Sequence, residues 1–261
     1  MKSFFLFTAW EMEKPTSYGA FHIITTLILL SIAILATYLL RKTDDKKNKI
    51  VLLTVGLFLI ITEVYKILFY HYVKPDYSLW WIFPYQLCSV PMYLCVISFF
   101  IKNKKVNDWI YAFMGIVNFL GGLMAFIEPS GIHHEYVTLT LHAYIWHMTL
   151  VFIGLYLFVT KRSVKNLYGY FKGMAVFFVA AGIAQTLNVI FRNISGFNLF
   201  YISPFTRSPL AVFKDFYVNI GWFWTMILYF LAIAIASAVI YYGLYGIQYL
   251  IDKKSKKTQA N

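Results

Sequence analysis

Long runs of apolar residues, separated by short polar segments, follow one another along the chain. Seven runs have about the 20 mostly apolar residues that an α-helix needs to cross the hydrocarbon core of a bilayer. They cover residues 20–40, 50–72, 82–101, 107–127, 138–160, 170–191 and 217–249. No repeat or linker interrupts them. The pattern predicts an all-α fold, a single transmembrane domain over residues 1–261 with about seven transmembrane helices.

Lysine and arginine gather in every second connection between these runs. The basic clusters lie within residues 41–49, 102–105, 161–172 and 253–257. Cytoplasmic loops of membrane proteins carry the excess of positive charge, so these four segments are predicted to lie in the cytoplasm. An N-terminus outside and a C-terminus inside follow, and this orientation requires an odd number of spans.

The composition agrees with a multi-pass protein of the cell membrane. Hydrophobic residues make up 60% of the chain and charged residues 13%, whereas soluble domains are about half apolar and a quarter charged. The net charge of +12 would point to nucleic acid in a soluble protein. Because the charge lies in short loops between spans, it indicates attraction to anionic lipid headgroups at the cytoplasmic face, and no nucleic-acid partner is expected.

Polar side chains within the predicted spans concentrate toward the outer surface, with Asn118 nearest the middle. They are Glu63, Lys66, Gln86, Cys88, Asn118, His142, His147, Gln185, Asn188 and Arg192. A channel needs polar groups through the whole thickness, and a transporter site usually lies near the midplane. A polar chamber on one side fits better with chemistry on, or capture of, an amphiphile. Glu63 and Lys66, three residues apart, are expected to pair with each other as a structural element.

Cys88 is the natural nucleophile of this chamber. Pro84 suits the first turn of a helix, which would place Cys88 one turn further in. A thiol in apolar surroundings needs a nearby base to react, and histidine is the usual one. The alternative is that Cys88 is a small hydrophobic residue that packs a helix. Cys95, seven residues further on, shares its helix face but is too distant for a disulfide.

The histidines do not have the spacing of a metal site. His142 and His147 are five residues apart, about 140° around a helix, whereas paired ligands on one helix favour a spacing of four. His133 and His134, with Glu128 and Glu135, form either a surface zinc site or, as we favour, a solvated loop. We expect no metal. The long connection 192–216 is a candidate lid or re-entrant segment.

Three short motifs resemble one family. They are Phe83-Pro84-Tyr85-Gln86-Leu87-Cys88-Ser89-Val90, then His147-Met148-Thr149-Leu150 leading to Leu155-Tyr156-Leu157, and finally Asn198-Leu199-Phe200-Tyr201-Ile202-Ser203-Pro204. Together they are similar to the YwaF-like family, which includes eukaryotic transmembrane protein 164. The resemblance spans most of the chain and rests on a proline followed by a Leu-Cys pair, a histidine-led helix and an outer loop.

The resemblance implies an integral membrane acyltransferase that acts on membrane phospholipids. A second lipid such as a lysophospholipid, or water, would accept the acyl chain, and we expect no cofactor. It makes Cys88 the acyl acceptor and His147 its base, and leaves the role of His142 open. In the mechanism that follows, Gln86, Asn118 or Asn188 would donate hydrogen bonds to the tetrahedral oxyanion. Arg192 and Arg207 would hold a lipid phosphate.

A carrier or transporter that binds a small amphiphile in an outward-facing chamber is the alternative. It would use the same polar groups without a nucleophile. Cys88 distinguishes the two hypotheses, because a carrier has little need of a thiol beside a histidine.

Overall fold

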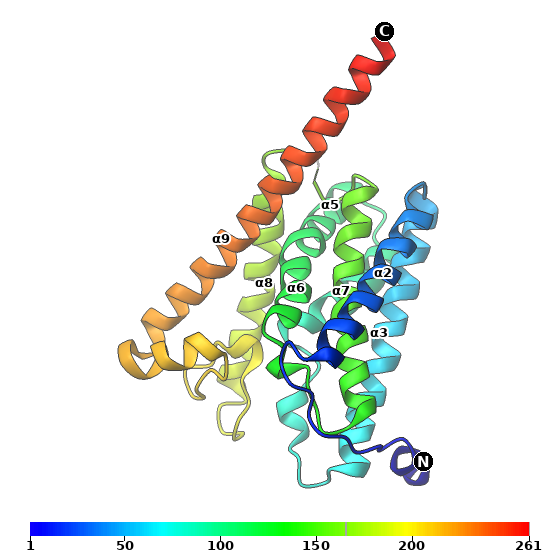
Figure 1. Cartoon of the computed structure of the whole chain (residues 1–261). Coiled ribbons are helices and arrows are strands. Elements are labelled where there is room, and N and C mark those ends of the chain that lie inside the picture. The colour runs from blue at the N-terminus through cyan, green and yellow to red at the C-terminus, as the bar shows by residue number, and fades with distance from the viewer. Residues whose placement is uncertain (165, 261) are drawn as a thin grey trace.

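The computed structural model describes residues 1–164 and 166–260, and within them every regular element is helical (Figure 1). The α-helices are α1 (Lys2–Phe7), α2 (Ala20–Leu40), α3 (Asp45–Val73), α4 (Val90–Phe100), α5 (Lys104–Phe113), α6 (Phe119–Ile127), α7 (Val137–Val159), α8 (Gly169–Ile190) and α9 (Ala211–Ala260). Single turns of other helix types are η1 (Leu79–Ile82), η2 (Leu87–Ser89), η3 (Met114–Asn118), η4 (Pro129–Gly131) and η5 (Leu199–Tyr201).

The number of membrane-crossing helices is close to the predicted seven. Six helices of the described residues are long and apolar enough to span a bilayer, and α5, η3 and α6 together form one of them, Lys104–Ile127. The predicted span 82–101 is instead a shorter apolar helix, Leu87–Phe100. Residues 82–89 form a loop and single turns, and the α-helix itself begins only at Val90. The helix therefore starts later than the hydropathy predicts. The chain is therefore a multi-pass membrane protein.

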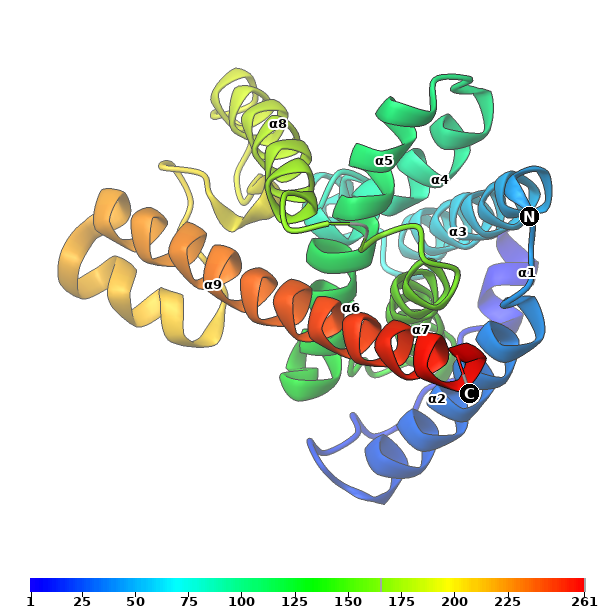
Figure 2. The same cartoon turned by 90° about the horizontal axis from the view of Figure 1, so that it is seen from above.

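Helix α7 lies at the centre of the bundle. It packs against α2, α3, α6 and η3, and Figure 2 shows α6 and α7 surrounded by the other helices. Twelve of its residues are buried. Helix α3 packs mainly against α4, and α5 packs against α8.

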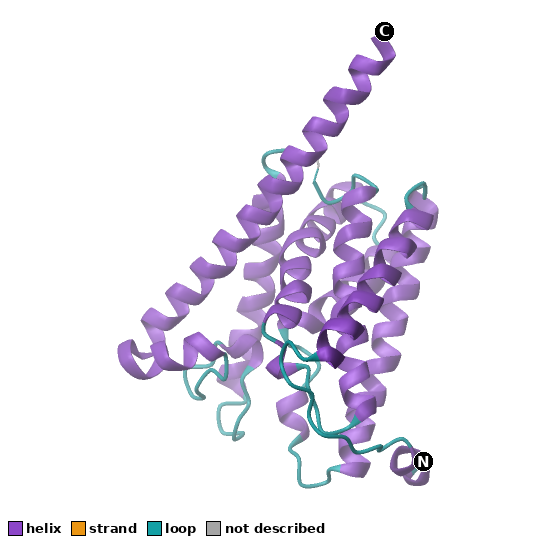
Figure 3. Ribbon diagram, viewed as in Figure 1, coloured by secondary structure: helices purple, strands orange, loops and turns teal. Residues whose placement is uncertain are grey.

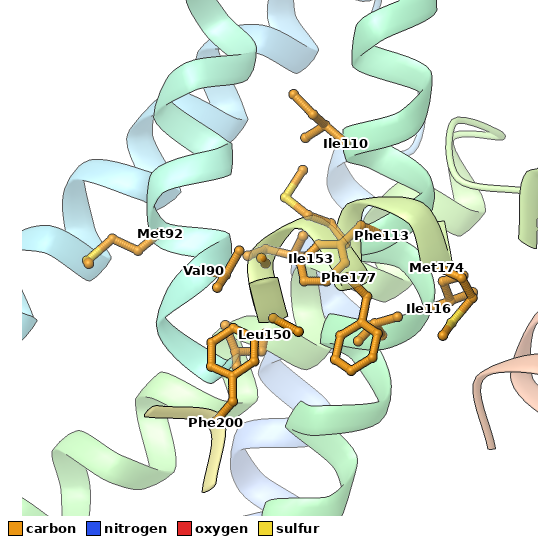
Figure 4. Packing of buried hydrophobic residues seen from close by; sticks show 14 of the residues in the cluster. Val90, Met92, Ile110, Phe113, Ile116, Leu150, Ile153, Met174, Phe177 and Phe200 are labelled. Atoms are coloured by element: carbon orange, nitrogen blue, oxygen red, sulfur yellow. The ribbon is translucent and has the colours of Figure 1, made fainter. Parts of the chain in front are cut away.

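The main hydrophobic core joins these helices across the middle of the bundle. Figure 4 shows Val90 of α4, Leu150 of α7 and Phe177 of α8 converging there. Phe200 of η5 reaches the same cluster from a loop and is 1% exposed. Residues 197–203, in the connection 192–216, are therefore anchored in the core. The lid or re-entrant segment predicted for this connection remains a prediction.

The two termini lie at opposite ends of the bundle (Figure 1). The N-terminal end holds the longer connections, residues 74–86, 128–136 and 191–210, and is called the loop-rich end below (Figure 3). The N-terminal segment is tied down there, because the amide of Val137 donates to the carbonyl of Trp10 at 2.9 Å. Helix α9 bends at Gly221, whose φ of 79° breaks the regular helix.

Candidate functional site

Cys88 lies at the loop-rich end, in the single turn η2 that leads into α4. Its thiol is free and the residue is half-buried. The prediction that Pro84 begins the helix was wrong. Pro84 lies in the loop before η2, and Pro91 is the proline in the first turn of α4, where its missing amide costs no helical hydrogen bond. Cys88 is therefore at the entrance of the helix rather than one turn inside it.

Hydrogen bonds fix the loop that precedes Cys88. The hydroxyl of Tyr93, on α4, donates to the carbonyl of Pro84 at 2.6 Å. The Gln86 side chain bonds twice to a distant segment. Its amide nitrogen donates to the carbonyl of Asn198 at 3.0 Å, and its oxygen accepts from the amide of Phe200 at 2.9 Å. Gln86, predicted to contact substrate, therefore joins residues 84–88 to residues 198–200.

The segment 198–203 is held from both sides. The amide nitrogen of Asn188, on α8, donates to the carbonyl of Leu199 at 3.1 Å, and the Asn188 oxygen accepts from the Leu199 amide at 2.8 Å. Phe200 and Tyr201 both have positive φ, 55° and 59°. Two consecutive non-glycine residues in this conformation are strained, and such strain persists where the surrounding structure enforces it. Hydrogen bonds from Asn188 and Gln86 thus hold the segment beside the Cys88 loop.

Trp146 of α7 contacts Cys88 directly. Its indole nitrogen donates to the Cys88 carbonyl at 3.1 Å. The ring of His142, one turn earlier, stacks on the Trp146 ring with centroids 5.6 Å apart. The His142 Nε2 is buried and has no hydrogen-bond partner among the described residues. The structure therefore connects His142 to the Cys88 segment through a tryptophan that sequence reasoning did not single out.

His147 is held in a defined tautomer. Its Nδ1 lies 2.8 Å from the carbonyl oxygen of Ala143. A carbonyl only accepts, so Nδ1 carries the proton and Nε2 keeps its lone pair, the state that a general base requires. Among the described residues, no hydrogen bond joins either imidazole to the Cys88 thiol. The pairing of Cys88 with His147 remains a prediction.

The predicted pair of Glu63 and Lys66 is confirmed. The Lys66 Nζ lies 2.8 Å from the Glu63 Oε1, and 5.9 Å from the centroid of the Trp146 ring. The Glu63 side chain is 4% exposed. Both charges act electrostatically on the Cys88 thiol. This ion pair belongs to the same site as Cys88 and Trp146.

The remaining predicted site residues are either exposed to solvent or already hydrogen-bonded within the protein. The Asn118 side-chain nitrogen donates to the carbonyls of Met114 and Leu150, at 3.1 and 3.2 Å. Arg192 and Arg207 are exposed in the connection between α8 and α9. Their contacts with an oxyanion or a phosphate remain predictions.

The predicted solvated loop is solvated only in part, because Glu128 and Glu135 are exposed but the two histidines are not. His133 is 3% exposed, and its Nε2 lies 2.8 Å from the hydroxyl of Tyr144. Burial, reinforced by the charge of Lys14, lowers the pKa of His134 to about 4, so His134 is neutral at physiological pH. No group of three or more metal-ligating side chains occurs among the described residues.

A protein-family model matches most of the chain. It is described as the TMEM164 family, and it matches residues 17–242, which include Cys88, His142 and His147. The chain belongs to the TMEM164 family. This assignment agrees with the resemblance found in the three short motifs. No curated protein and no solved structure shows a detectable similarity to the chain.

Some uncharged residues of this TMEM164-family site hold it together by hydrogen bonds, and sequence reasoning did not assign them that role. The Trp146 indole N–H and the Asn198 amide N–H both donate inside the protein, the latter to the carbonyl of Thr206 at 3.2 Å. The Asn198 oxygen accepts from the amide of Ser203 at 2.9 Å. A polar N–H in the middle of an apolar run needs a partner, and that need is the signal that could have indicated Trp146.

Proposed function

We propose that the protein is an integral membrane phospholipid acyltransferase that works through an acyl-cysteine thioester on Cys88. The observation that carries the proposal is a free, half-buried cysteine at the start of the short apolar helix α4. Its carbonyl accepts from Trp146, whose ring also contacts Lys66 of the buried ion pair. The resemblance of the Leu-Cys motif to that of the family supplies the class of reaction. The donor would be a membrane phospholipid and the acceptor a lysophospholipid.

The reaction would run in two steps. In the first, His147 takes the thiol proton, and the Cys88 sulfur attacks an ester carbonyl of the donor lipid. The tetrahedral intermediate collapses with loss of the lysolipid oxygen, which takes the proton back from His147, and a thioester remains. In the second, His147 takes a proton from the acceptor hydroxyl, whose oxygen attacks the thioester. Cys88 leaves as a thiolate and regains the proton.

The geometry supports the assignment of roles in this scheme. The His147 Nε2 lone pair is free to accept a proton, because Nδ1 donates to Ala143. Cys95 is fully buried in the hydrophobic core, which leaves Cys88 as the thiol that a lipid ester can approach. The loop-rich end also carries the exposed arginines Arg192 and Arg207. A lipid phosphate at the membrane surface would bind to such groups.

The experiment is an acyl-transfer assay with purified protein in liposomes, a labelled diacyl phospholipid and a lysophospholipid acceptor. Cys88→Ser should abolish or sharply reduce transfer, because serine is a weak nucleophile without a fully assembled triad. Cys95→Ala is the matched control and should keep most of the activity. Undiminished transfer by Cys88→Ser would rule out the covalent mechanism. Absence of both transfer and hydrolysis on common lipids, with retained lipid binding, would favour the carrier function.

A further inference from the structure

The buried ion pair of α3 lies in an environment where charge is expensive. Lys66 and Glu63 are joined at 2.8 Å, and their side chains are 22% and 4% exposed. The second carboxylate oxygen of Glu63 is buried and has no hydrogen-bond partner among the described residues. Removing two charges from water costs several kcal/mol per ion, and the attraction between them often fails to repay it. In a membrane protein, such a pair indicates a functional role.

The pair faces Cys88 through Trp146. The Lys66 Nζ lies 5.9 Å from the centroid of the indole ring, and the indole N–H donates to the Cys88 carbonyl at 3.1 Å. One tryptophan thus contacts the cation with its ring and the cysteine with its N–H. A cation over an aromatic face is attracted by the ring quadrupole, and the attraction is stronger when the pair is desolvated. Trp146 therefore lies between Lys66 and the backbone carbonyl of Cys88.

Titratable groups of several elements interact electrostatically with the Cys88 thiol. Lys66 and Glu63 act on it electrostatically from α3, Tyr201 from η5 and Tyr229 from α9. Lys66 acts on His142 and His147 of α7 as well. Among these groups Lys66 is the cation, as its ion pair with Glu63 shows. A thiolate or an oxyanion formed here would find its counter-ion in Lys66.

We propose that the Glu63–Lys66 pair sets the reactivity of Cys88. The Lys66 ammonium stabilises the thiolate, and in the reaction proposed above, on which this second role rests, it stabilises the oxyanion that forms from the substrate carbonyl. Glu63 holds Lys66 in place and weakens its field. An opposite charge close to an ionisable group favours the charged form, and a like charge disfavours it. The two members of the pair therefore have opposite effects on the thiol.

The test measures the rate at which Cys88 is alkylated by N-ethylmaleimide, in a Cys95→Ala background, without added lipid substrate. At neutral pH, Lys66→Met should slow alkylation by about tenfold or more, because a nearby opposite charge changes ionisation by at least that factor. Glu63→Gln should accelerate it, because the field of Lys66 is then uncompensated. Lys66→Arg keeps the charge and should retain most of the parental rate. Lys74→Met, at the end of the same helix, is the matched control and should leave the rate unchanged.

The pH dependence separates electrostatics from access to the thiol. The deficit of Lys66→Met should narrow as the pH rises, because alkali forms the thiolate without help from Lys66. An unchanged rate in Lys66→Met, a deficit equal at all pH values, or effects of the same sign in Lys66→Met and Glu63→Gln would overturn the inference. Because alkylation needs no lipid turnover, its outcome is independent of the acyl-transfer assay. The proposed function can thus be wrong while the activation of the thiol by Lys66 is right. The activation can likewise be wrong while the proposed function is right.

Discussion

Two cysteines seven residues apart have different surroundings in this fold. Cys95, on α4, is fully buried in the hydrophobic core, and its sulfur lies 3.6 Å from that of Met114. Cys88 is half-buried at the helix entrance, next to Trp146. The sequence predicted Cys88 as the candidate from its motif. It could not predict the tryptophan contact, because that contact depends on how α7 packs against the start of α4.

The two histidines of α7 should differ in their effect on acyl transfer. His147→Ala should lower the rate of thioester formation by about 10²–10⁴-fold, the usual contribution of a general base. His142→Ala should cost less, since His142 stacks on Trp146 and shapes the site. Single-turnover kinetics with a labelled donor lipid measure the step directly. A larger loss in His142→Ala than in His147→Ala would transfer the role of base to His142.

At the scale of elements, hydropathy located the spans well and their irregularities poorly. The predicted run 20–40 coincides with α2, and 138–160 and 170–191 differ from α7 and α8 by one residue at each end. The π-helical turn η3 and the late start of α4 were not predicted. Both depend on tertiary contacts. Asn118 bonds to the carbonyl of Leu150 on α7, and Gln86 bonds to a loop more than a hundred residues away.

Gly56 sets the close approach of α3 and α4. A Cβ at this position would lie 2.9 Å from the Cβ of Cys95 and 2.8 Å from a methyl carbon of Val96. Gly56→Ala should therefore destabilise the protein by about 1–3 kcal/mol, as overpacking usually does. Thermal unfolding in detergent measures the effect.

Gly182→Ala is the control for this prediction. A Cβ on Gly182, in α8, would meet nothing within 4 Å, and alanine is the better helix former. The thermal midpoint of this variant should equal or exceed that of the parent. A Gly56→Ala midpoint as high as that of Gly182→Ala would show that the two helices are not packed as closely as the structure has them.

At the scale of the whole molecule, the termini lie at opposite ends of the bundle (Figure 1). This arrangement requires an odd number of crossings, so the shorter helix α4 must cross beside the six candidate spans. The basic connections follow α2, α4 and α7, and the longer loops with Cys88 lie at the other end (Figure 3). The positive charge of the short loops predicts which end faces the cytoplasm. The site would then face the outer leaflet.

The predicted orientation can be measured with a reporter fused to the C-terminus. The reporter should behave as cytoplasmic, because the basic loops at that end are retained inside. A second reporter, placed in the loop at Ser130, should behave as external. Signals of the opposite kind from the two fusions would show that the predicted orientation is inverted. The proposed site would then face the inner leaflet.

Intact-protein mass spectrometry tests the central claim most directly. After incubation with a diacyl phospholipid, the parent should gain the mass of one acyl chain, and neutral hydroxylamine should remove it, as expected of a thioester. Peptide mapping should place the adduct on Cys88. Cys95→Ala should acquire the same adduct, and Cys88→Ser should acquire none. An adduct that persists in Cys88→Ser, or a parent that forms no adduct while it transfers acyl chains, would contradict the account.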